Sequence, residues 1–331
     1  MDSTQYTVDP TESQANLMKP AMTRSALVLV GVLAVAGLLP PPAAAQGDGP
    51  HNLPMLPVGM NLVVPMTLVL SGNFNPSQTV LIPGASVDVV AVPITYVRTF
   101  AFGDRFGRLF VTAPLATLDA SAEALDPILG EYRFIERRRS GWMDPIVTMH
   151  VGLVGAPALK LPEFVKRPRA FQMVGIFATS IPIGTYDPKR LINLGTNRWS
   201  FRLGVGTVAP FGEGKKTALE SANSVLFFTA NTDLRLADER SQAPLFVSEN
   251  HLTHNFTPTT WGSVDLRWQV GGETTTDGVD DDNLTNILGG GVTLGHQFTP
   301  HLGGYGSYGA VLAKKGDAKE WMLRFQLAYS F

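Results

Sequence analysis

The C-terminal segment, residues 320–331, alternates between two kinds of side chain. Its odd-numbered positions are all apolar or aromatic: Trp321, Leu323, Phe325, Leu327, Tyr329 and Phe331. Its even-numbered positions include Glu320, Arg324 and Gln326. A period of two residues places the two sets on opposite faces of a β-strand. One face suits lipid and the other suits a polar interior, which is the pattern of a strand in a transmembrane β-barrel.

Similar alternation recurs in segments that begin near residues 198, 225 and 261. An arginine on the lipid face at mid-bilayer would cost ~2–4 kcal/mol, so the charged positions are predicted to face the lumen. This inward set comprises Arg198, Arg202, Asp233, Arg235, Asp265, Arg267, Glu320 and Arg324. Such a set can line a polar path for a solute, or it can form ion pairs that stiffen the wall. The sequence leaves both interpretations open.

About twelve segments have strand character, and an even number is typical of single-chain bacterial barrels. They are residues 60–72, 86–102, 107–119, 143–156, 169–184, 198–210, 222–236, 244–256, 260–272, 284–298, 301–312 and 319–331. Two of these segments, 169–184 and 244–256, alternate poorly. The prediction is an all-β fold, a closed antiparallel transmembrane barrel over residues 60–331.

The composition agrees with a membrane barrel. Charged residues make up 16% of the chain, well below the ~25% of soluble domains. The net charge of −2 argues against a nucleic-acid partner, which needs a basic field. The chain has no cysteine, which excludes thiolate metal sites and cysteine nucleophiles. We expect no cofactor and no catalytic or metal site.

The N-terminal region has the pattern of a secretory signal. A short basic region with Arg24 precedes an apolar run, and small residues precede a cleavage point after Ala45. The run is shorter than the ~20 residues that a spanning helix needs. We therefore predict a cleaved signal peptide within residues 1–45. Residues 1–21 are polar, and Met22 is the expected start.

Residues 46–59 follow the predicted cleavage point and are rich in proline and glycine. Proline and glycine weaken a strand, so this segment is not expected to join the barrel wall. It can enter the lumen as a plug, or it can lie as a periplasmic tail. The sequence does not choose between the two.

Loop lengths and aromatic positions predict the orientation. With both termini in the periplasm, the long connections are extracellular and the short turns periplasmic. Residues 120–142, 185–197 and 273–283 are long connections on the extracellular side. Two connections on the periplasmic side, 157–168 and 211–221, are also long, which weakens the rule without reversing it. Aromatic residues at strand ends predict two belts at the membrane interfaces. The outer belt is Trp199, Trp268 and Trp321, and the inner belt is Phe256, Phe298, Tyr329 and Phe331.

Two charged loop segments have competing interpretations. Residues 136–139 hold three consecutive arginines, and guanidinium groups match the phosphates of lipopolysaccharide; the alternative is a solvated charge run. The segment from Asp277 to Asp282 offers clustered carboxylates, which hard cations prefer. It lacks the ligand spacing of an EF-hand, so a structural turn is favoured.

A lipid hydrolase is a remote alternative. Ser248, Glu249, His251 and His254 form the densest group of nucleophile and base candidates. Alternation places Glu249 and His251 on one face of the strand and Ser248 and His254 on the other. A nucleophile must lie within hydrogen-bond reach of its base, and neither serine–histidine pair fits. The chain is therefore not predicted to be an enzyme.

The chain also resembles a known family of outer-membrane transporter-like barrels, labelled "putative MetA-pathway of phenol degradation". The resemblance runs from about His51 to Phe331 and is carried by four motifs. They are His51–Gly59, Gly184–Asp187, Ile192–Trp199, and Gly271–Glu273 with Asp277–Val279. The resemblance implies transport connected with aromatic compounds, and it transfers no catalytic residues.

These features predict an outer-membrane channel for passive diffusion of small hydrophobic or aromatic molecules. The expected partners are outer-membrane lipids, lipopolysaccharide and a small solute. The terminal strand that ends at Phe331 resembles the signal read by the barrel assembly machinery. A structural or surface-interaction barrel without transport is the alternative.

Overall fold

The computed structural model describes residues 48–331 apart from 73–85, 126–131, 191–192, 236 and 315–319. The predicted signal peptide and its cleavage point therefore lie outside the described residues. Among the described residues, no helix is long and apolar enough to cross a membrane.

Twelve antiparallel strands form a closed barrel, as predicted. In order around the wall they are β1 (Asn61–Gly72), β2 (Ser86–Phe102), β3 (Arg105–Leu125), β5 (Ile146–Val154), β6 (Gln172–Ser180), β7 (Ser200–Phe211), β8 (Thr217–Phe228), β10 (Leu245–Asn255), β11 (Thr260–Gly271), β14 (Thr285–Gln297), β15 (Leu302–Lys314) and β16 (Glu320–Ser330). β1 closes the ring, because Val63 lies opposite Tyr329 of β16 and Tyr96 of β2.

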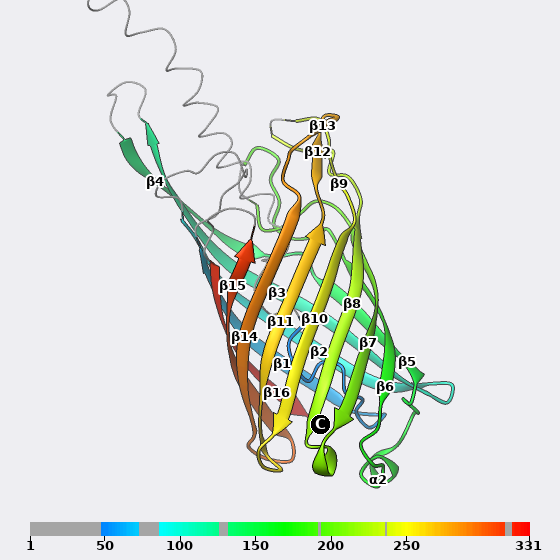
Figure 1. Cartoon of the computed structure of the whole chain (residues 1–331). Helices are drawn as coiled ribbons and strands as arrows, with labels where there is room; N and C mark the ends of the chain where they lie inside the picture. Colours follow the sequence, from blue (N-terminus) through cyan, green and yellow to red (C-terminus); the bar gives the residue numbers. More distant parts are fainter. Residues whose placement is uncertain (1–47, 73–85, 126–131, 191–192, 236, 315–319) are drawn as a thin grey trace, which may run out of the picture.

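The remaining elements lie at the two ends of the barrel (Figure 1). We call the end with α2 (Leu161–Phe164), η1 (Glu213–Lys215) and the C-terminus the turn end. The opposite end is the loop end. It carries β4 (Tyr132–Trp142) and a small sheet of β9 (Arg240–Gln242), β12 (Thr274–Thr276) and β13 (Val279–Asp280).

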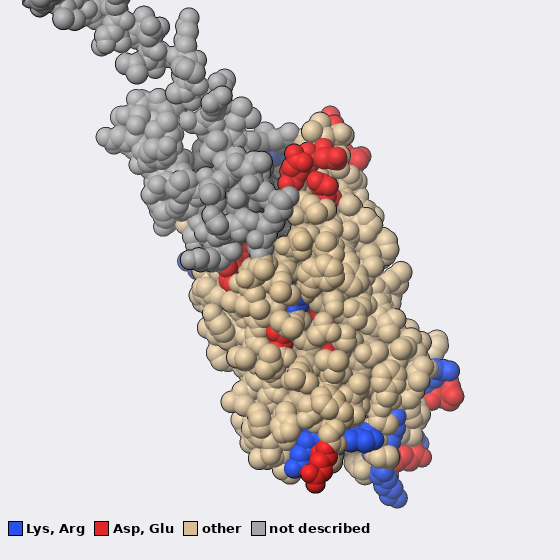
Figure 2. Space-filling model, in the orientation of Figure 1, with Lys and Arg blue, Asp and Glu red and all other residues tan. Residues whose placement is uncertain are grey.

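Successive side chains of each strand point alternately to the inner and the outer face of the wall. On β16, Met322 and Arg324 are buried on the inside, whereas Trp321, Phe325 and Tyr329 are exposed outward. Charged residues concentrate at the two ends of the face seen in Figure 2, and the band between them is almost free of charge apart from a small group near its middle. This band has the apolar character that a barrel presents to lipid.

The seven predicted interface aromatics are all exposed, and they sit near strand ends. Three lie toward the loop end: Trp199, Trp268 and Trp321. Four lie at the turn end: Phe256, Phe298, Tyr329 and Phe331. Their contact with the membrane interface remains a prediction.

The poor alternation of residues 244–256 has a local cause on the outer face of β8 and β10. Ser248 and Asn250 point outward there, where apolar side chains are usual. The Asn250 side chain accepts a hydrogen bond from the Ser221 hydroxyl at 2.7 Å and donates one to the Ser248 hydroxyl at 3.0 Å. Polar groups that satisfy one another can face lipid at a lower cost than isolated ones.

Two predicted boundaries are wrong. The segment predicted to be a strand over 222–236 leaves the wall after Phe228, where β8 ends. Beyond it, Asn231 and Arg240 exchange two backbone hydrogen bonds, of 2.9 and 2.8 Å, which fold the chain into a loop. The predicted loop 120–142 is instead largely a hairpin of β3 and β4 that extends the wall. In it, Arg138 lies 3.6 Å from the Asp119 carboxylate.

Candidate functional site in the barrel lumen

The inner wall of the barrel has an apolar half. It is formed by β1, β2 and β3, whose inward side chains pack with one from β16. The buried cluster comprises Leu70, Val87, Val89, Ala91, Ala116, Leu118, Leu194 and Met322. These strands are apolar on both faces, because Val90, Val92 and Ile94 of β2 are exposed on the outside. Burial of a large apolar side chain contributes ~1.5–3 kcal/mol, so this cluster stabilises the loop-end part of the wall.

The opposite half of the inner wall is polar and comes from β7 to β16. Its buried side chains include Glu220, Ser224, Glu249, His251, Thr253, Ser263, Asp265, Gln269, Thr293, Ser307 and Arg324. Each is on the inward parity of its strand. The lumen therefore has two chemically different sides.

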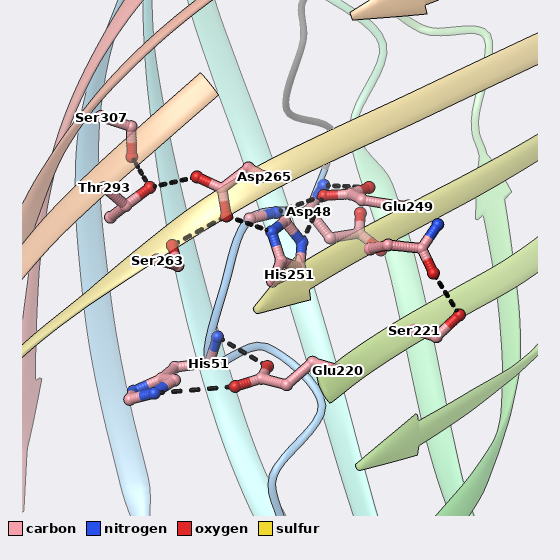
Figure 3. A network of polar contacts seen from close by, with 12 residues as sticks. Asp48, His51, Glu220, Ser221, Glu249, His251, Ser263, Asp265, Thr293 and Ser307 are labelled. Carbon is pink, nitrogen blue, oxygen red and sulfur yellow. Dashed lines mark hydrogen bonds and ion pairs between the residues drawn. The ribbon is translucent and has the colours of Figure 1, made fainter. Parts of the chain in front are cut away.

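His251 lies at the centre of the polar half, between two carboxylates (Figure 3). Its Nδ1 is 2.6 Å from the Asp265 carboxylate, and its Nε2 is 3.1 Å from the Glu249 carboxylate. Asp265 also accepts hydrogen bonds of 2.8 Å from the hydroxyls of Ser263 and Thr293. Buried charges are stable only when they are paired in this way, so the cluster cross-links β10, β11 and β14.

Residues 48–60 run through the lumen and are held by polar contacts along their length. Glu249 accepts hydrogen bonds from the backbone N–H groups of Asp48 at 3.1 Å and Gly49 at 2.8 Å. Arg202 pairs with the Asp48 carboxylate at 2.7 Å. Hydrogen bonds to charged groups contribute ~1.5–3 kcal/mol each. The wall therefore anchors the start of this segment.

The same segment is anchored further along by Arg108 and by apolar contacts. The Arg108 guanidinium donates to the carbonyls of Asn52 and Pro54. Leu53 packs into a second buried cluster, with Val174, Ile176, Val208, Ala218 and Ala222. Met55 packs with Phe106 and Ala156 near the turn end. Residues 48–59 thus occupy the lumen; that they act as a plug is a proposal taken up below.

Three rings, those of His51, Trp261 and Tyr305, pack together in the lumen near the turn end. The His51 ring stacks on Trp261 with centroids 3.9 Å apart and an angle of 24° between planes. Tyr305 meets the same indole edge-on at 5.8 Å. Gly295 makes room for the indole, since a Cβ there would overlap the ring. The His51 backbone N–H donates to the Glu220 carboxylate at 2.9 Å.

A folded loop covers the loop end, and it contains two motifs that carried the family resemblance. The Asp144 carboxylate accepts hydrogen bonds from the backbone N–H groups of Gly184 and Thr196, both at 2.8 Å. These contacts place Leu194 in the apolar inner cluster. Arg198 lies in the same loop, and burial lowers its pKa to about 10, so it stays charged at neutral pH.

The predicted lumen residues lie in three places. On the inner face of the wall are Arg202, Asp265, Arg267, Glu320 and Arg324. Arg198 precedes β7 and contacts Gln242 and the Phe228 ring at the loop end. Asp233 and Arg235 lie in the connection after β8 and are exposed, so their prediction as wall residues is wrong. The chain leaves the barrel before it reaches them.

Several functional candidates were missed by the sequence. Arg108, Glu220 and Gln172 hold the segment in the lumen. Glu249 was weighed only as a catalytic candidate, although it is also an inward anchor. Strand alternation could have identified Glu220 and Glu249 as inward residues. On the inward face of its strand, Glu220 lies two residues from Ala222, and Glu249 lies two residues from Val247.

The histidine cluster is not arranged for nucleophilic catalysis. Both ring nitrogens of His251 contact carboxylates, so neither can take a proton from a serine. Ser263 donates to Asp265 rather than to the imidazole. A serine nucleophile needs a direct contact with its base. His254, the other candidate base, lies exposed on the outer face and contacts Thr217.

The acidic segment from Asp277 to Asp282 forms a turn in which the carboxylates bind protein groups. Asp277 accepts hydrogen bonds of 2.9 Å from the backbone N–H groups of Asp238 and Glu239. Asp281 binds the hydroxyls of Thr274 and Thr276. Within the described part of the chain, no group of three or more acidic or histidine side chains could hold a metal ion.

A closed antiparallel barrel with an apolar outer band defines a transmembrane β-barrel of the bacterial outer membrane. The sequence matches the family described as "Putative MetA-pathway of phenol degradation" over residues 71–330, and the chain belongs to that family. The match begins after the segment in the lumen. No curated protein matches the sequence.

Comparison with solved structures gives several similar chains, and the likeness to the first of these shows the fold. The COG4313 outer membrane channel from Pseudomonas putida F1 superposes with a TM-score of 0.69 at 20% identity, covering 86% of this chain and 99% of that one. The translocator domain of the autotransporter NalP from Neisseria meningitidis gives 0.44 at 12% identity, over 93% of this chain and 97% of that one. The Ralstonia pickettii toluene transporter TbuX gives 0.41 at 8% identity, over 83% and 90%.

Proposed function

We propose that this protein is a passive outer-membrane channel for small apolar molecules, above all aromatic ones. The observation that carries the proposal is the apolar inner half formed by β1, β2 and β3. A barrel that only needs stability can fill its lumen with polar pairs, as the other half does. This apolar patch, at the loop-end part of the three strands, gives a hydrophobic solute a surface along which it can leave water.

The likeness to the Pseudomonas putida channel and the family description, which refers to phenol degradation, support this proposal. The His251 cluster does not support the alternative of a lipid hydrolase, because both of its ring nitrogens contact carboxylates. Residues 48–59 act as a plug that must move, at least in part, before a solute passes. In this arrangement the loop end faces the cell exterior.

Uptake by cells of a Gram-negative host tests the proposal. Cells that produce the protein should take up a labelled monocyclic aromatic compound several-fold faster than cells with an empty vector. A double variant, Val87→Thr with Val89→Thr, makes the inner face of β2 polar with little change of volume and should remove most of the gain.

The matched control is Val90→Thr with Val92→Thr, which places the same change on the outer face of the same strand. It should keep the uptake rate. Uptake equal to that of the empty vector would favour the alternative of a structural barrel without transport. Equal losses in both double variants would show that the inner face does not guide the solute.

A further inference from the structure

His51 contacts the wall of the barrel in the way that a bound ligand contacts its site. His51 presents a flat ring to the face of Trp261, with 3.9 Å between centroids. Offset stacking at this distance is favourable for any aromatic ring, not only for imidazole. Trp261 of β11 lies opposite Gly295 of β14, which in turn lies opposite Tyr305 of β15.

The polar part of this contact is a buried carboxylate. Glu220 is only 1% exposed, and it accepts a hydrogen bond from the His51 backbone N–H at 2.9 Å. The His51 Nε2 lies 3.6 Å from its other oxygen (Figure 3). If His51 leaves, the carboxylate loses these donors. Loss of hydrogen-bond donors is costly for a buried carboxylate, so a replacement donor on an incoming molecule would be favoured.

Two features indicate that His51 can leave. Its backbone has a φ of 61°, in the left-handed region that non-glycine residues rarely adopt. The side chain is 35% exposed although its ring stacks on a residue of the inner wall. In contrast, Leu53 and Met55 on the same segment are both 4% exposed.

We infer that Trp261, Tyr305 and Glu220 form a binding subsite for a flat aromatic molecule with a hydroxyl or N–H donor, and that His51 fills this subsite when the channel is closed. The inference rests on the proposed function, because the ligand has to enter the lumen. The ring of the ligand stacks on Trp261, and its donor binds the Glu220 carboxylate. The site lies toward the turn end, where a solute would leave the barrel.

Fluorine NMR of the full chain in detergent micelles tests this directly. The chain has five tryptophans, so labelling with 5-fluorotryptophan gives a small set of resonances, and Trp261→Phe identifies the one from Trp261. Phenol is the probe. In His51→Ala, phenol should shift the Trp261 resonance saturably, with half-saturation about tenfold lower than in the unmodified chain, a difference of ~1.4 kcal/mol.

Matched controls separate the parts of the site. Cyclohexanol has the size and hydroxyl of phenol but is not flat, and it should not shift the resonance. His254→Ala removes an imidazole that packs with Phe256 on the outer face, and it should behave like the unmodified chain. Adding Glu220→Gln to His51→Ala should weaken the binding of phenol several-fold. It should leave the binding of toluene unchanged, because toluene has no hydrogen-bond donor.

The subsite is wrong if phenol leaves the Trp261 resonance of His51→Ala in place while the other resonances stay dispersed, or if cyclohexanol shifts it equally. These outcomes are independent of cellular uptake. Uptake without a shift would overturn the subsite and keep the channel. A shift without uptake would keep the subsite and overturn the channel.

Discussion

At the scale of single residues, the position of a charge relative to the wall decides its energetic role. Asp265 is fully buried and contacts His251, Ser263 and Thr293. Asp233 belongs to the same predicted set but lies exposed in a loop. Removing one partner of a buried ion pair leaves the other charge without compensation. The two aspartates should therefore respond very differently to the same substitution.

Asp265→Ala should destabilise the barrel by ~3–5 kcal/mol, whereas Asp233→Ala should be close to neutral. The measurement is the temperature at which heating converts the compact, fast-migrating form on a detergent gel to the unfolded form. Asp265→Asn, which keeps part of the hydrogen bonding, should fall between them. Equal temperatures for the two alanine variants would contradict the structural role of the cluster.

Sequence alternation identifies a lumen residue only while the chain stays in the wall. It correctly placed Arg202 and Asp265 inside, because each lies in the middle of a strand. It misplaced Arg235, because β8 ends at Phe228 and its inward residues are the even-numbered ones, such as Glu220 and Ser224. It gave no weight to Glu220, because the predicted strand began at residue 222, whereas β8 begins at Thr217.

At the scale of elements, residues 48–60 are the part that the sequence could least place. An irregular segment has no alternation that shows which side chains face inward. Its proline and glycine content excluded a strand but did not decide between the lumen and the periplasm. The choice depends on space left by the wall. At Gly206 of β7, a Cβ would overlap the Leu53 side chain. This glycine therefore leaves the space in the wall that Leu53 occupies.

Gly206→Val should displace Leu53 from its buried position against the wall, since overpacking costs ~1–3 kcal/mol. The chain has no cysteine, so Met55→Cys can report the position of the segment by maleimide labelling. Labelling should be slow in the parent, where Met55 is 4% exposed. It should become several-fold faster when Gly206→Val is added.

Leu53→Ala combined with Gly206→Val restores the space and should slow the labelling again. His301→Cys, at an exposed turn position, should react fast in every background. Labelling of Met55→Cys at the same rate with and without Gly206→Val would mean that the Leu53 contact does not hold the segment.

At the scale of the whole molecule, closure of twelve strands was predictable, because the period of two recurs along the chain and ends on an aromatic strand. The two-sided lumen was not. In β1 and β2 both faces are apolar, so alternation disappears where the inner wall is most unusual. A rule that assigns charged positions to the inside describes only the half of the barrel that contains them.

The orientation of the barrel is a property of the whole molecule and can be tested with two matched glycines. Gly278 lies at the loop end between β12 and β13 with a φ of 80°, and Gly103 lies at the turn end between β2 and β3 with a φ of 62°. A Cβ at either position would meet nothing within 4 Å. Exposed turn tips of this kind tolerate insertions.

An epitope inserted after Gly278 should be labelled by antibody on intact cells. The same epitope after Gly103 should be labelled only once the outer membrane is permeabilised. This follows from long connections outside and short turns in the periplasm. Labelling of the Gly103 insertion alone on intact cells would reverse the barrel. The Trp261 subsite would then lie at the entrance of the channel, and a solute would meet His51 before it reached the apolar inner wall.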